Sequence, residues 1–571
     1  MASANSQQRR LTLEALMIGV AGALAARGFD WSVHLVQRLL LTGLAGYVPP
    51  GLASRGEPPT EHIGPHGLWL VPVATTLGGL LSGWLVYTWA PEAEGHGTDV
   101  AVRAFHQRGG FIRARVPIVK TIASAITIGS GGSAGYEGPT ALITGGLASV
   151  YATWLKRSDR ERRMLLLMGV SAGLSAIFRS PVGAAIFGVE VLYQTIEFEA
   201  AALFYTMLAS IAAYALNGLF VGWHPLFDIP PLEPPHLGAY AWYAFLGVTG
   251  GVVAAGLPTA FYRTRDAFRA LPLPAAFRPA LGGLGLGLLA LLVPQVLGGG
   301  YGWIQHAIDG QLATRLLLGL VAAKVVGLCL TVSSGGSGGV FAPTLYVGAM
   351  LGAAFAQLFA LPVAPFVLVG MAAVFAGAAR VPLATLFFVT EMTSGFELLV
   401  AGALAVMLSF MVQEALSSRL HYKSLYEGQV PGRADSPAHQ VEQLQSSLRL
   451  LASGTMTGQP DLVHLDLVRL IEAGVPIELQ TDQLKIAAVA PDSHLVGQRL
   501  DSLVPPALAG ELRVVALLRD HAIALARPDA VLAPGDGLIA IVAPGGRAWF
   551  DRGFGLDPRG LRPPPVTSAT A

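Results

Sequence analysis

The sequence SGGSAGYEGPT at residues 130–140 returns as SGGSGGVFAPT at residues 334–344, so a glycine-rich loop that runs into a Pro-Thr helix start occurs twice. A second pair of segments repeats at nearly the same offset, since RSP at 179–181 matches RVP at 380–382. The chain is therefore internally duplicated. Apolar segments broken by Gly and Pro at matching places in two halves are typical of the binding site of a membrane transporter, where half-helix N-termini meet.

The composition is that of an integral membrane protein. Hydrophobic residues make up 53% of the chain and charged residues 13%, and the mean hydropathy is +0.55, whereas a typical soluble domain is about 25% charged. Apolar stretches run from about residue 11 to residue 417, and several are shorter than the roughly 20 apolar residues that cross a bilayer. They predict half-membrane helices that are buried within the protein. The net charge of +1 gives no reason to expect a nucleic-acid partner.

The first apolar run follows Arg9 and Arg10, as in a secretory signal. No small-residue cleavage site leads into a polar domain, however, and many further spans follow, so we interpret this run as a membrane segment. Basic residues recur at 106–120, 156–163 and 263–269. Because positive residues gather on the cytoplasmic side of membrane proteins, we expect these segments and both termini in the cytoplasm.

The two glycine-rich loops have the chemistry of an anion site. Glycines let the backbone approach a ligand, and the helix start that follows offers unpaired N–H groups at the positive end of its dipole. Such dipoles bind an anion weakly enough to release it again. No phosphate-loop lysine follows either loop, so nucleotide hydrolysis is disfavoured. We expect neither an enzyme nor a metal or cofactor site.

Glu137 is the acid of the first loop, and the second loop has Phe341 in its place. A carboxylate among anion-binding amides competes with the transported anion and leaves when it is protonated, which predicts a gate or a proton carrier. A structural glutamate that caps the next helix is the alternative. Intramembrane acids are functional more often than structural, which favours the gate.

Taken together, these motifs resemble the CLC family of chloride channels and proton-coupled chloride transporters over about residues 11–427. GYEGP at 135–139 is similar to the family's G-K/R-E-G-P, GVFAP at 339–343 to its G-x-F-x-P, and KSLY at 423–426 to the end of its last membrane helix. A weaker match is GHGTD at 95–99, where the family has G-S-G-I-P.

The resemblance implies an α-helical polytopic membrane protein with the CLC fold. Residues 1–427 would form a transmembrane domain of two inverted repeats, at about 66–221 and 238–427, built of tilted and partial helices. The resemblance further implies a homodimer in the lipid membrane, in which each subunit holds its own chloride pore.

The same resemblance assigns a gate and a set of anion-binding residues. Glu137 would be the gating glutamate. Three groups would bind the anion: the amides around Tyr136 and Gly138 at an outer site, those of Val340 and Phe341 at a central site, and the Tyr426 hydroxyl on the inner side.

Two residues depart from the family's pattern near the anion. His96 replaces the serine that usually contacts the central anion, so it either attracts anions as a pH-sensitive cation or packs against a loop. Tyr136 replaces an Arg or Lys, which removes a positive charge from the outer mouth. We expect this loss to weaken anion capture at low salt without abolishing it.

A third departure bears on mechanism. Proton-coupled members carry two adjacent acids at the end of the Pro-led helix, whereas this chain has Glu190 followed by Val191, which cannot hold a proton. Glu190 matches Glu391 of the second repeat and is interpreted as a structural acid. Val191 favours a passive, glutamate-gated chloride channel of the voltage-gated type. The alternative is a chloride/proton antiporter, with Glu197 or Glu199 as a substitute proton site, or an exporter of another anion such as fluoride.

Other intramembrane charges have structural interpretations. Arg179 and Arg380 precede prolines at matching helix starts and are expected to bond loop carbonyls. Lys120 and Lys324 are expected to pair or to reach toward the membrane surface. His306 is expected on a surface loop.

After residue 417 the chain becomes polar and is expected to leave the membrane. We interpret this region as a linker at 428–480 with helices at 441–451 and 461–471, a small α+β cytoplasmic domain at 481–545, and a disordered tail at 546–571. Strands are expected in the domain at 484–489, 513–518 and 538–542.

This domain resembles the C-terminal subdomain of potassium-uptake regulators, the TrkA-C or RCK-C type, through LVG at 495–497 and PGD at 534–536. Such domains pair across a dimer and can hold a small ligand there. The resemblance implies either regulation of gating, with a nucleotide as one candidate ligand, or a role in assembly alone. It also indicates a prokaryotic source and hence a bacterial inner membrane. A non-transporting membrane sensor is a further alternative, but it leaves the duplicated loops unexplained.

Overall fold

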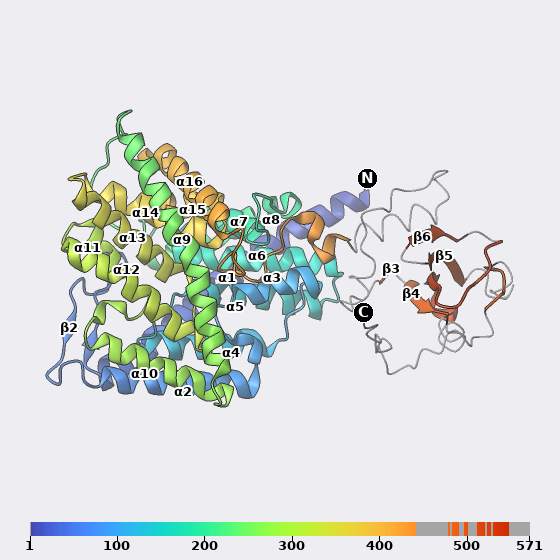
Figure 1. The fold of residues 1–571 in the computed structure, drawn as a ribbon, viewed down its shortest axis with the longest axis horizontal. Coiled ribbons are helices and arrows are strands. Elements are labelled where there is room, and N and C mark those ends of the chain that lie inside the picture. Colours follow the sequence, from blue (N-terminus) through green and yellow to red (C-terminus); the bar gives the residue numbers. More distant parts are fainter. Residues whose placement is uncertain are drawn as a thin grey trace. The chain divides into compact units, whose positions relative to one another are not determined.

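The computed structural model describes residues 2–440, 478–479, 482–489, 496–500, 511–519, 522–526 and 529–546. The chain forms two compact units, Met1–Arg433 and Ala434–Ala571 (Figure 1). The helices expected in the linker, at 441–451 and 461–471, and the tail at 547–571 lie outside the described residues.

The first unit is made of two sets of helices that follow each other in the same order (Figure 1). The first set holds α1 (Ala2–Gln37), α2 (Val71–Trp89), α3 (Thr98–Gln107), α4 (Arg115–Gly129), α5 (Glu137–Trp154), α6 (Asp159–Phe178), α7 (Pro181–Glu190) and α8 (Ala200–Val221). The second set holds α9 (Ala239–Ala270), α10 (Arg278–Ala290), α11 (Tyr301–Ile308), α12 (Thr314–Leu328), α13 (Phe341–Leu358), α14 (Val363–Ala379), α15 (Pro382–Thr393) and α16 (Leu399–Ser417).

The two sets also pack alike. Helix α1 packs on α6 and α8, and α9 packs on α14 and α16 in the same way. Helix α5 lies against α6 as α13 lies against α14, and the short helices α7 and α15 pack on each other. This packing places α1 in the first repeat, which therefore starts well ahead of the expected residue 66. The sequence signal missed it because α1 carries none of the repeated motifs.

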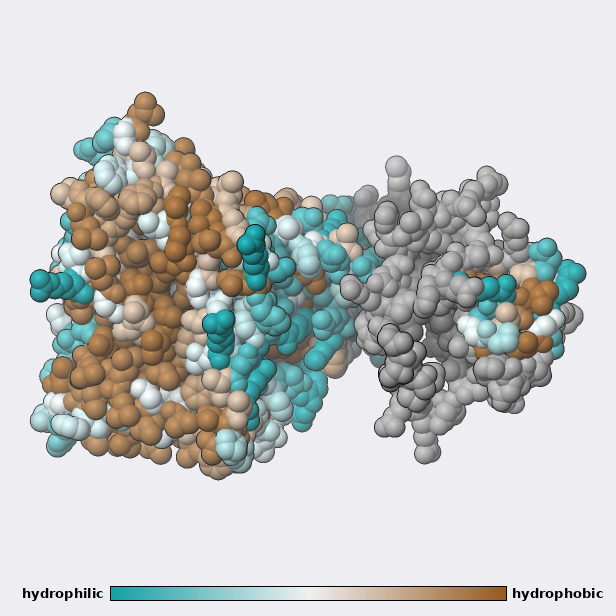
Figure 2. All heavy atoms as spheres, viewed as in Figure 1, coloured by the Kyte–Doolittle hydropathy of each residue, from teal (hydrophilic) through white to brown (hydrophobic). Residues whose placement is uncertain are grey.

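The first unit has the surface and the helix lengths of a membrane protein. Within the described residues, seven helical stretches are long and apolar enough to cross a membrane, in α1, α2, α8, α9, α12, α13 and α16. Helices α3, α7 and α11 have only 10, 10 and 8 residues, so they are the partial helices that the sequence predicts. Apolar side chains cover much of the visible face of this unit (Figure 2), a wider apolar surface than soluble proteins expose.

The two glycine-rich loops bind each other directly. The Gly135 N–H donates to the Gly339 carbonyl at 2.8 Å, and the Gly339 N–H donates to the Gly135 carbonyl at 2.8 Å. A Cβ atom on Gly339 would lie 2.9 Å from the Gly135 oxygen, so only glycine allows this approach. Helices α5 and α13 begin two residues after these glycines, and the pairing therefore holds their N-termini side by side.

Two buried lysines stabilise the loops that flank this pair. Lys120 Nζ donates to the carbonyls of Ala93 (3.0 Å) and Gly95 (2.6 Å). Lys324 Nζ donates to the carbonyls of Val296 (2.9 Å) and Gly298 (2.7 Å), at the matching place of the second repeat. Both lysines are fully buried, so they pair with the backbone rather than reaching toward the membrane surface.

Two glutamates cap the short helices across the repeat boundary. The Glu190 carboxylate, at the end of α7, accepts hydrogen bonds from the Leu383 and Ala384 N–H groups at the start of α15, at 3.0 and 2.7 Å. Glu391, in α15, accepts from the Val182 and Gly183 N–H groups at the start of α7. A negative charge at a helix N-terminus satisfies N–H groups that have no partner within the helix. Glu190 thus has the structural role that its place in the sequence predicts.

We predict that Glu190→Ala destabilises the protein by about 2 to 4 kcal/mol, because it leaves two buried N–H groups of α15 without an acceptor. Glu397→Ala, at an exposed acid in the same region, is the matched control. Thermal unfolding of the purified full-length protein in detergent would measure both. Equal melting temperatures for the two variants would contradict the capping role.

The second unit is built on an antiparallel sheet of β3 (Glu478–Leu479), β4 (Asp482–Ala488), β5 (Leu512–Arg519), β6 (Ala522–Leu525) and β7 (Gly537–Val542), in the order β3-β4-β7-β5-β6. The three expected strands correspond to β4, β5 and β7. The turns at 496–497 and 534–535 place Gly497 and Gly535 at positive φ, where glycine is favoured. Val489, Leu517 and Leu538 pack in its core.

Asp536 fixes the turn before β7. Its carboxylate accepts hydrogen bonds from Arg519 Nε (2.8 Å), Arg519 Nη2 (2.6 Å) and the Ala533 N–H (2.7 Å). The hydrogen bond from Arg519 holds the pKa of Asp536 below its usual range, since it favours the charged form. The contribution of Asp536 to stability is therefore present at neutral pH and is lost as the pH falls through the usual aspartate range to the lowered value.

We predict that Asp536→Asn speeds amide hydrogen exchange in β5 and β7 of the full-length protein at pH 7, because the neutral amide binds Arg519 more weakly. Asp529→Asn is the control, because Asp529 is an exposed acid close to Asp536 in the sequence. Mass spectrometry of peptides from both strands would give the rates. Unchanged exchange in Asp536→Asn would show that the ion pair does not hold the sheet.

Candidate functional site

Glu137 lies where the N-termini of the two repeats meet. It begins α5, is 2% exposed, and accepts a hydrogen bond from the Ala342 N–H in the first turn of α13 at 3.4 Å. The Tyr301 hydroxyl, at the start of α11, also donates to this carboxylate. The carboxylate thus binds to donors from the second repeat that an anion would use in its place.

Phe341 begins α13 beside this carboxylate. Its ring lies 4.4 Å from that of Phe178, 4.1 Å from Phe375 and 5.3 Å from Phe388, between ring centroids. The first N–H groups of a helix have no intrahelical acceptor, and those of Val340 and Phe341 open α13. The rings give the start of α13 apolar neighbours, and dipoles in a low-dielectric surrounding attract an anion more strongly than in water.

Tyr426 and His96 come together with this cluster. The Tyr426 ring lies 6.3 Å from Phe187, which itself contacts Phe341, and 5.5 Å from His96. A Cβ atom on Gly138 would lie 1.9 Å from the His96 carbonyl oxygen, so the loop of His96 rests directly on the start of α5. The structure therefore brings together residues that the sequence places more than three hundred positions apart.

The His96 side chain lies beside a carboxylate. Its Nε2 lies 3.4 Å from the Asp99 carboxylate, which also accepts a hydrogen bond from the Gly428 N–H at 3.0 Å. Its Nδ1 is buried and has no hydrogen-bond partner among the described residues. We call the cavity here the His96 vestibule; it is about 190 Å³ in volume and is lined by His96, Asp99, Arg103, Arg108, Phe261, Arg265, Arg269 and Glu427 among others.

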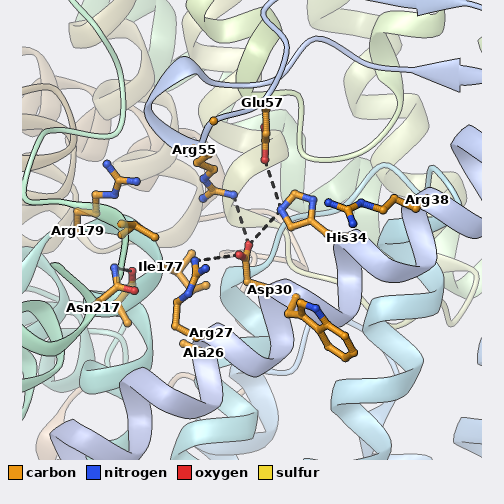
Figure 3. Close-up of a pocket in the computed structure, with 14 residues that line it drawn as sticks. Ala26, Arg27, Asp30, His34, Arg38, Arg55, Glu57, Ile177, Arg179 and Asn217 are labelled. Atoms are coloured by element: carbon orange, nitrogen blue, oxygen red, sulfur yellow. Dashed lines mark hydrogen bonds and ion pairs between the residues drawn. The ribbon is translucent and has the colours of Figure 1, made fainter. Parts of the chain in front are cut away.

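Tyr136 directly precedes Glu137 in the chain and belongs to another group of aromatic rings. Its ring packs between Phe29 and Tyr301, with centroids 5.9 and 6.4 Å away. The Arg55 guanidinium lies 5.5 Å from the Tyr136 ring centroid. Arg55 also lines a cavity that we call the Arg55 vestibule (Figure 3). The residues that line it include Arg27, Asp30, His34, Arg38, Arg55, Glu57 and Arg179.

Val191 follows α7 directly and is 2% exposed among apolar neighbours. Of the two acids proposed as substitutes, Glu197 is exposed and accepts a hydrogen bond from the Arg433 N–H. Glu199 is buried, accepts a hydrogen bond from the Tyr193 hydroxyl, and lies 3.4 Å from Arg433 Nε. Of these two acids, Glu199 is therefore the buried one.

Arg179 donates to the carbonyls of Ser54 and His224, as expected, whereas Arg380 donates to the side chains of Gln413 and Ser417 rather than to loop carbonyls. His306 lies in α11, so the prediction of a surface loop was wrong. The glycines at 298–300 resemble a loop in sequence, but the helix begins directly after them.

Sequence reasoning missed Tyr301, Arg55 and Asp99. The repeat spacing could have indicated Tyr301, because it lies 203 residues after Thr98. Thr98 begins the short helix α3, and Tyr301 begins the short helix α11. Arg55 had none, since it belongs to a connection between helices that carries no repeated motif.

With this geometry in view, the comparisons with known proteins decide the family. Residues 78–414 match the family model described as voltage gated chloride channel, and residues 484–551 match the TrkA-C domain. The chain belongs to the voltage gated chloride channel family, the CLC family. The fold is thus the CLC fold of two inverted repeats that the sequence predicts, followed by a TrkA-C domain.

Two relatives are named as exchangers. The chain is 28% identical over 431 residues to the H(+)/Cl(-) exchange transporter ClcA of Salmonella arizonae, covering 73% of this chain and 88% of the relative. It is 29% identical over 427 residues to ClcA of Salmonella agona, covering 72% and 87%.

Solved structures share the fold. A slow cyanobacterial Cl−/H+ antiporter aligns with a TM-score of 0.63 at 22% identity, over 73% of this chain and 96% of the other. A CLC-type fluoride/proton antiporter aligns with a TM-score of 0.61 at 22% identity, over 74% and 98%. At this identity the likeness concerns the fold.

We predict that Tyr301→Phe increases anion flux at neutral pH by about tenfold, because it removes a hydrogen bond to the charged Glu137 carboxylate, worth roughly 1.5 kcal/mol. The carboxylate then leaves its place more readily. Tyr346→Phe is the matched control, since the Tyr346 hydroxyl is buried without a hydrogen-bond partner among the described residues. Chloride efflux from proteoliposomes would compare them. If Tyr301→Phe behaves like the control, the hydroxyl does not hold the gate.

Proposed function

We propose that the protein exchanges chloride for protons across a membrane, with Glu137 as both gate and proton carrier. The observation that carries this proposal is the Glu137 carboxylate bound at the N-terminus of α13 through the Ala342 N–H. Charged, it fills the position of an anion. Protonated, it loses most of its attraction to the helix dipole, and chloride takes its place.

The neighbouring residues would then perform distinct tasks. The N–H groups of Val340 and Phe341 would bind chloride at the centre of the path, and the Tyr426 hydroxyl would donate to it from the side of the His96 vestibule. None of these groups carries a full charge, so chloride would bind weakly enough to move on. The rings around Phe341 would exclude water, and a path free of water forces the proton to travel on Glu137.

A proton must also reach Glu137 from the other side of the membrane. Val191 cannot carry it, so we propose Glu199, which is buried and hydrogen-bonded to the Tyr193 hydroxyl, as the internal proton site. The support for exchange is the set of relatives named as H(+)/Cl(-) exchange transporters.

A passive, glutamate-gated chloride channel is the second candidate, and Val191 is the observation that favours it. In a channel, Glu137 would open and close the path without moving a proton through the membrane. Fluoride is the alternative anion, because His96 replaces a residue that contacts the central anion in the family.

The distribution of charge supports an orientation in the membrane. Arg10 pairs with Glu161, and Arg162 Nε donates to the Gly109 carbonyl at 2.8 Å, so the basic N-terminal segments gather at the end of α3. The His96 vestibule on this side adds Arg103 and Arg265. By the positive-inside rule, we propose that this side and both termini face the cytoplasm of a bacterial cell and that the Arg55 vestibule faces outward.

Two parts of the proposal concern assembly and regulation. We propose a homodimer with one path in each subunit. The TrkA-C domain is the proposed place for regulation by a nucleotide, with a role in assembly alone as the alternative.

The experiment is chloride flux into proteoliposomes, with an internal pH dye, against an imposed proton gradient. Exchange predicts that chloride drives protons uphill. Glu137→Gln should conduct chloride without moving protons, and Glu199→Gln should slow proton movement more than chloride movement. The exposed Glu197→Gln is the control for Glu199.

Chloride flux with no proton movement in the wild-type protein would reject exchange and establish the channel. Full coupling in Glu199→Gln would leave exchange standing and reject Glu199 as the internal proton site. Fluoride flux without chloride flux would show that fluoride, not chloride, is the transported anion.

A further inference from the structure

Arg55 brings a positive charge back to the side of the gate where Tyr136 has removed one. It ends the short helix η2 (Ala53–Arg55), in the connection between α1 and α2. Its guanidinium lies 5.5 Å from the Tyr136 ring centroid and 5.1 Å from that of Tyr301. Because the Tyr301 hydroxyl donates to Glu137, only one ring separates the charge of Arg55 from the gate.

The turn that carries Arg55 is fixed on both sides. The Ser54 carbonyl accepts a hydrogen bond from Arg179 Nη2 at 2.9 Å, and the Ser54 hydroxyl donates to the Leu226 carbonyl. The Leu52 N–H donates to Glu57 Oε2 at 3.1 Å and closes the turn. The backbone of the turn therefore fixes the position of Arg55, and its side chain adds a long ion pair with Asp30 at 3.8 Å.

The N–H groups of the Arg55 guanidinium have no hydrogen-bond acceptor among the described residues. Its nearest carboxylate oxygen, on Asp30, lies at 3.8 Å, beyond hydrogen-bonding distance, and Asp30 is already bound by Arg27 at 3.1 Å. Among the described residues, Arg55 donates no side-chain hydrogen bond and rests on two aromatic faces, which hold a cation without using its N–H groups. The side chain is 13% exposed, and Arg55 lines the cavity.

The surrounding cavity favours anions. It is about 250 Å³ in volume, and its lining includes four arginines against two acids, Arg27, Arg38, Arg55 and Arg179 against Asp30 and Glu57 (Figure 3). Burial alone would lower the pKa of Arg55, but Asp30 and Glu57 raise it above its usual value, so Arg55 stays charged. His34 lies between the two acids, with Nε2 3.6 Å from Asp30 and 3.4 Å from Glu57.

We propose that Arg55 is the residue that captures small monovalent anions in this vestibule and delivers them to the gate. Chloride would bind to the unused N–H groups of the guanidinium. When Glu137 leaves its place, the ion would pass along the Tyr136 and Tyr301 rings, which line a second cavity that Arg55 also borders. A charge inside a low-dielectric cavity raises the local concentration of the opposite ion, and the effect weakens with salt. The inference rests on the proposed anion transport but not on whether protons are coupled.

Chloride uptake into proteoliposomes, measured against external chloride at constant low ionic strength, tests this. Arg55→Gln should raise the half-saturating chloride concentration about threefold or more with little change in the maximal rate, and Arg55→Lys should restore most of the affinity. The difference from wild type should shrink at about 1 M salt, where charges are screened beyond roughly 3 Å. Arg38→Gln is the matched control, because Arg38 lines the same cavity and is exposed. Among the described residues, Arg55 and not Arg38 makes the cation–π contacts with the two tyrosine rings.

An unchanged half-saturating concentration in Arg55→Gln, or an equal change in Arg38→Gln, would overturn the proposal. A second measurement does not depend on transport: anomalous diffraction from wild-type crystals grown in bromide. A bromide peak beside the Arg55 guanidinium supports capture, and bromide bound elsewhere in the vestibule but not at Arg55 rejects it. If the wild type moves no chloride at all, the proposed function fails, while the bromide positions still decide the role of Arg55.

Discussion

The two hydrogen bonds between Gly135 and Gly339 are the contact on which the rest of the structure depends. They hold the start of α5 against the start of α13, so the positive ends of helices from both repeats meet at one place. Glycine is required there because a Cβ atom would meet the partner's backbone. The lysines at 120 and 324 and the glutamates at 190 and 391 support this contact from each side by binding backbone groups that would otherwise be buried without partners.

In the proposed function, this arrangement makes an anion site without placing a full positive charge in the path. A full positive charge within the path would hold chloride more tightly than helix N–H groups do, since these bind it weakly. The cost of weak binding is slow capture, and a charge at the entrance offsets it. Arg55 sits at the entrance, outside the path itself and separated from Glu137 by the Tyr301 ring. In this proposal, Arg55 attracts the anion, and the helix N–H groups bind it along the path.

The sequence predicted the parts of the protein that are repeated. The duplicated loops located Glu137, Val340 and Phe341, and the Pro-led segments located Glu190 and Glu391 as a structural pair, because each motif could be read against its copy. Helix α1 and Arg55 could not be found in this way, since neither lies in a repeated motif. Their contacts join segments more than eighty residues apart, and local pattern carries no information about such contacts.

The central claim is that the Glu137 carboxylate and the transported anion use the same position at the start of α13. Anomalous diffraction from bromide-grown crystals of Glu137→Gln tests it most directly. The account predicts a bromide ion within hydrogen-bonding distance of the Ala342 N–H, where the wild-type protein holds its carboxylate. A bromide-free position in Glu137→Gln, with bromide still bound at Val340 and Phe341, would contradict it, because the carboxylate would then not be competing with the anion.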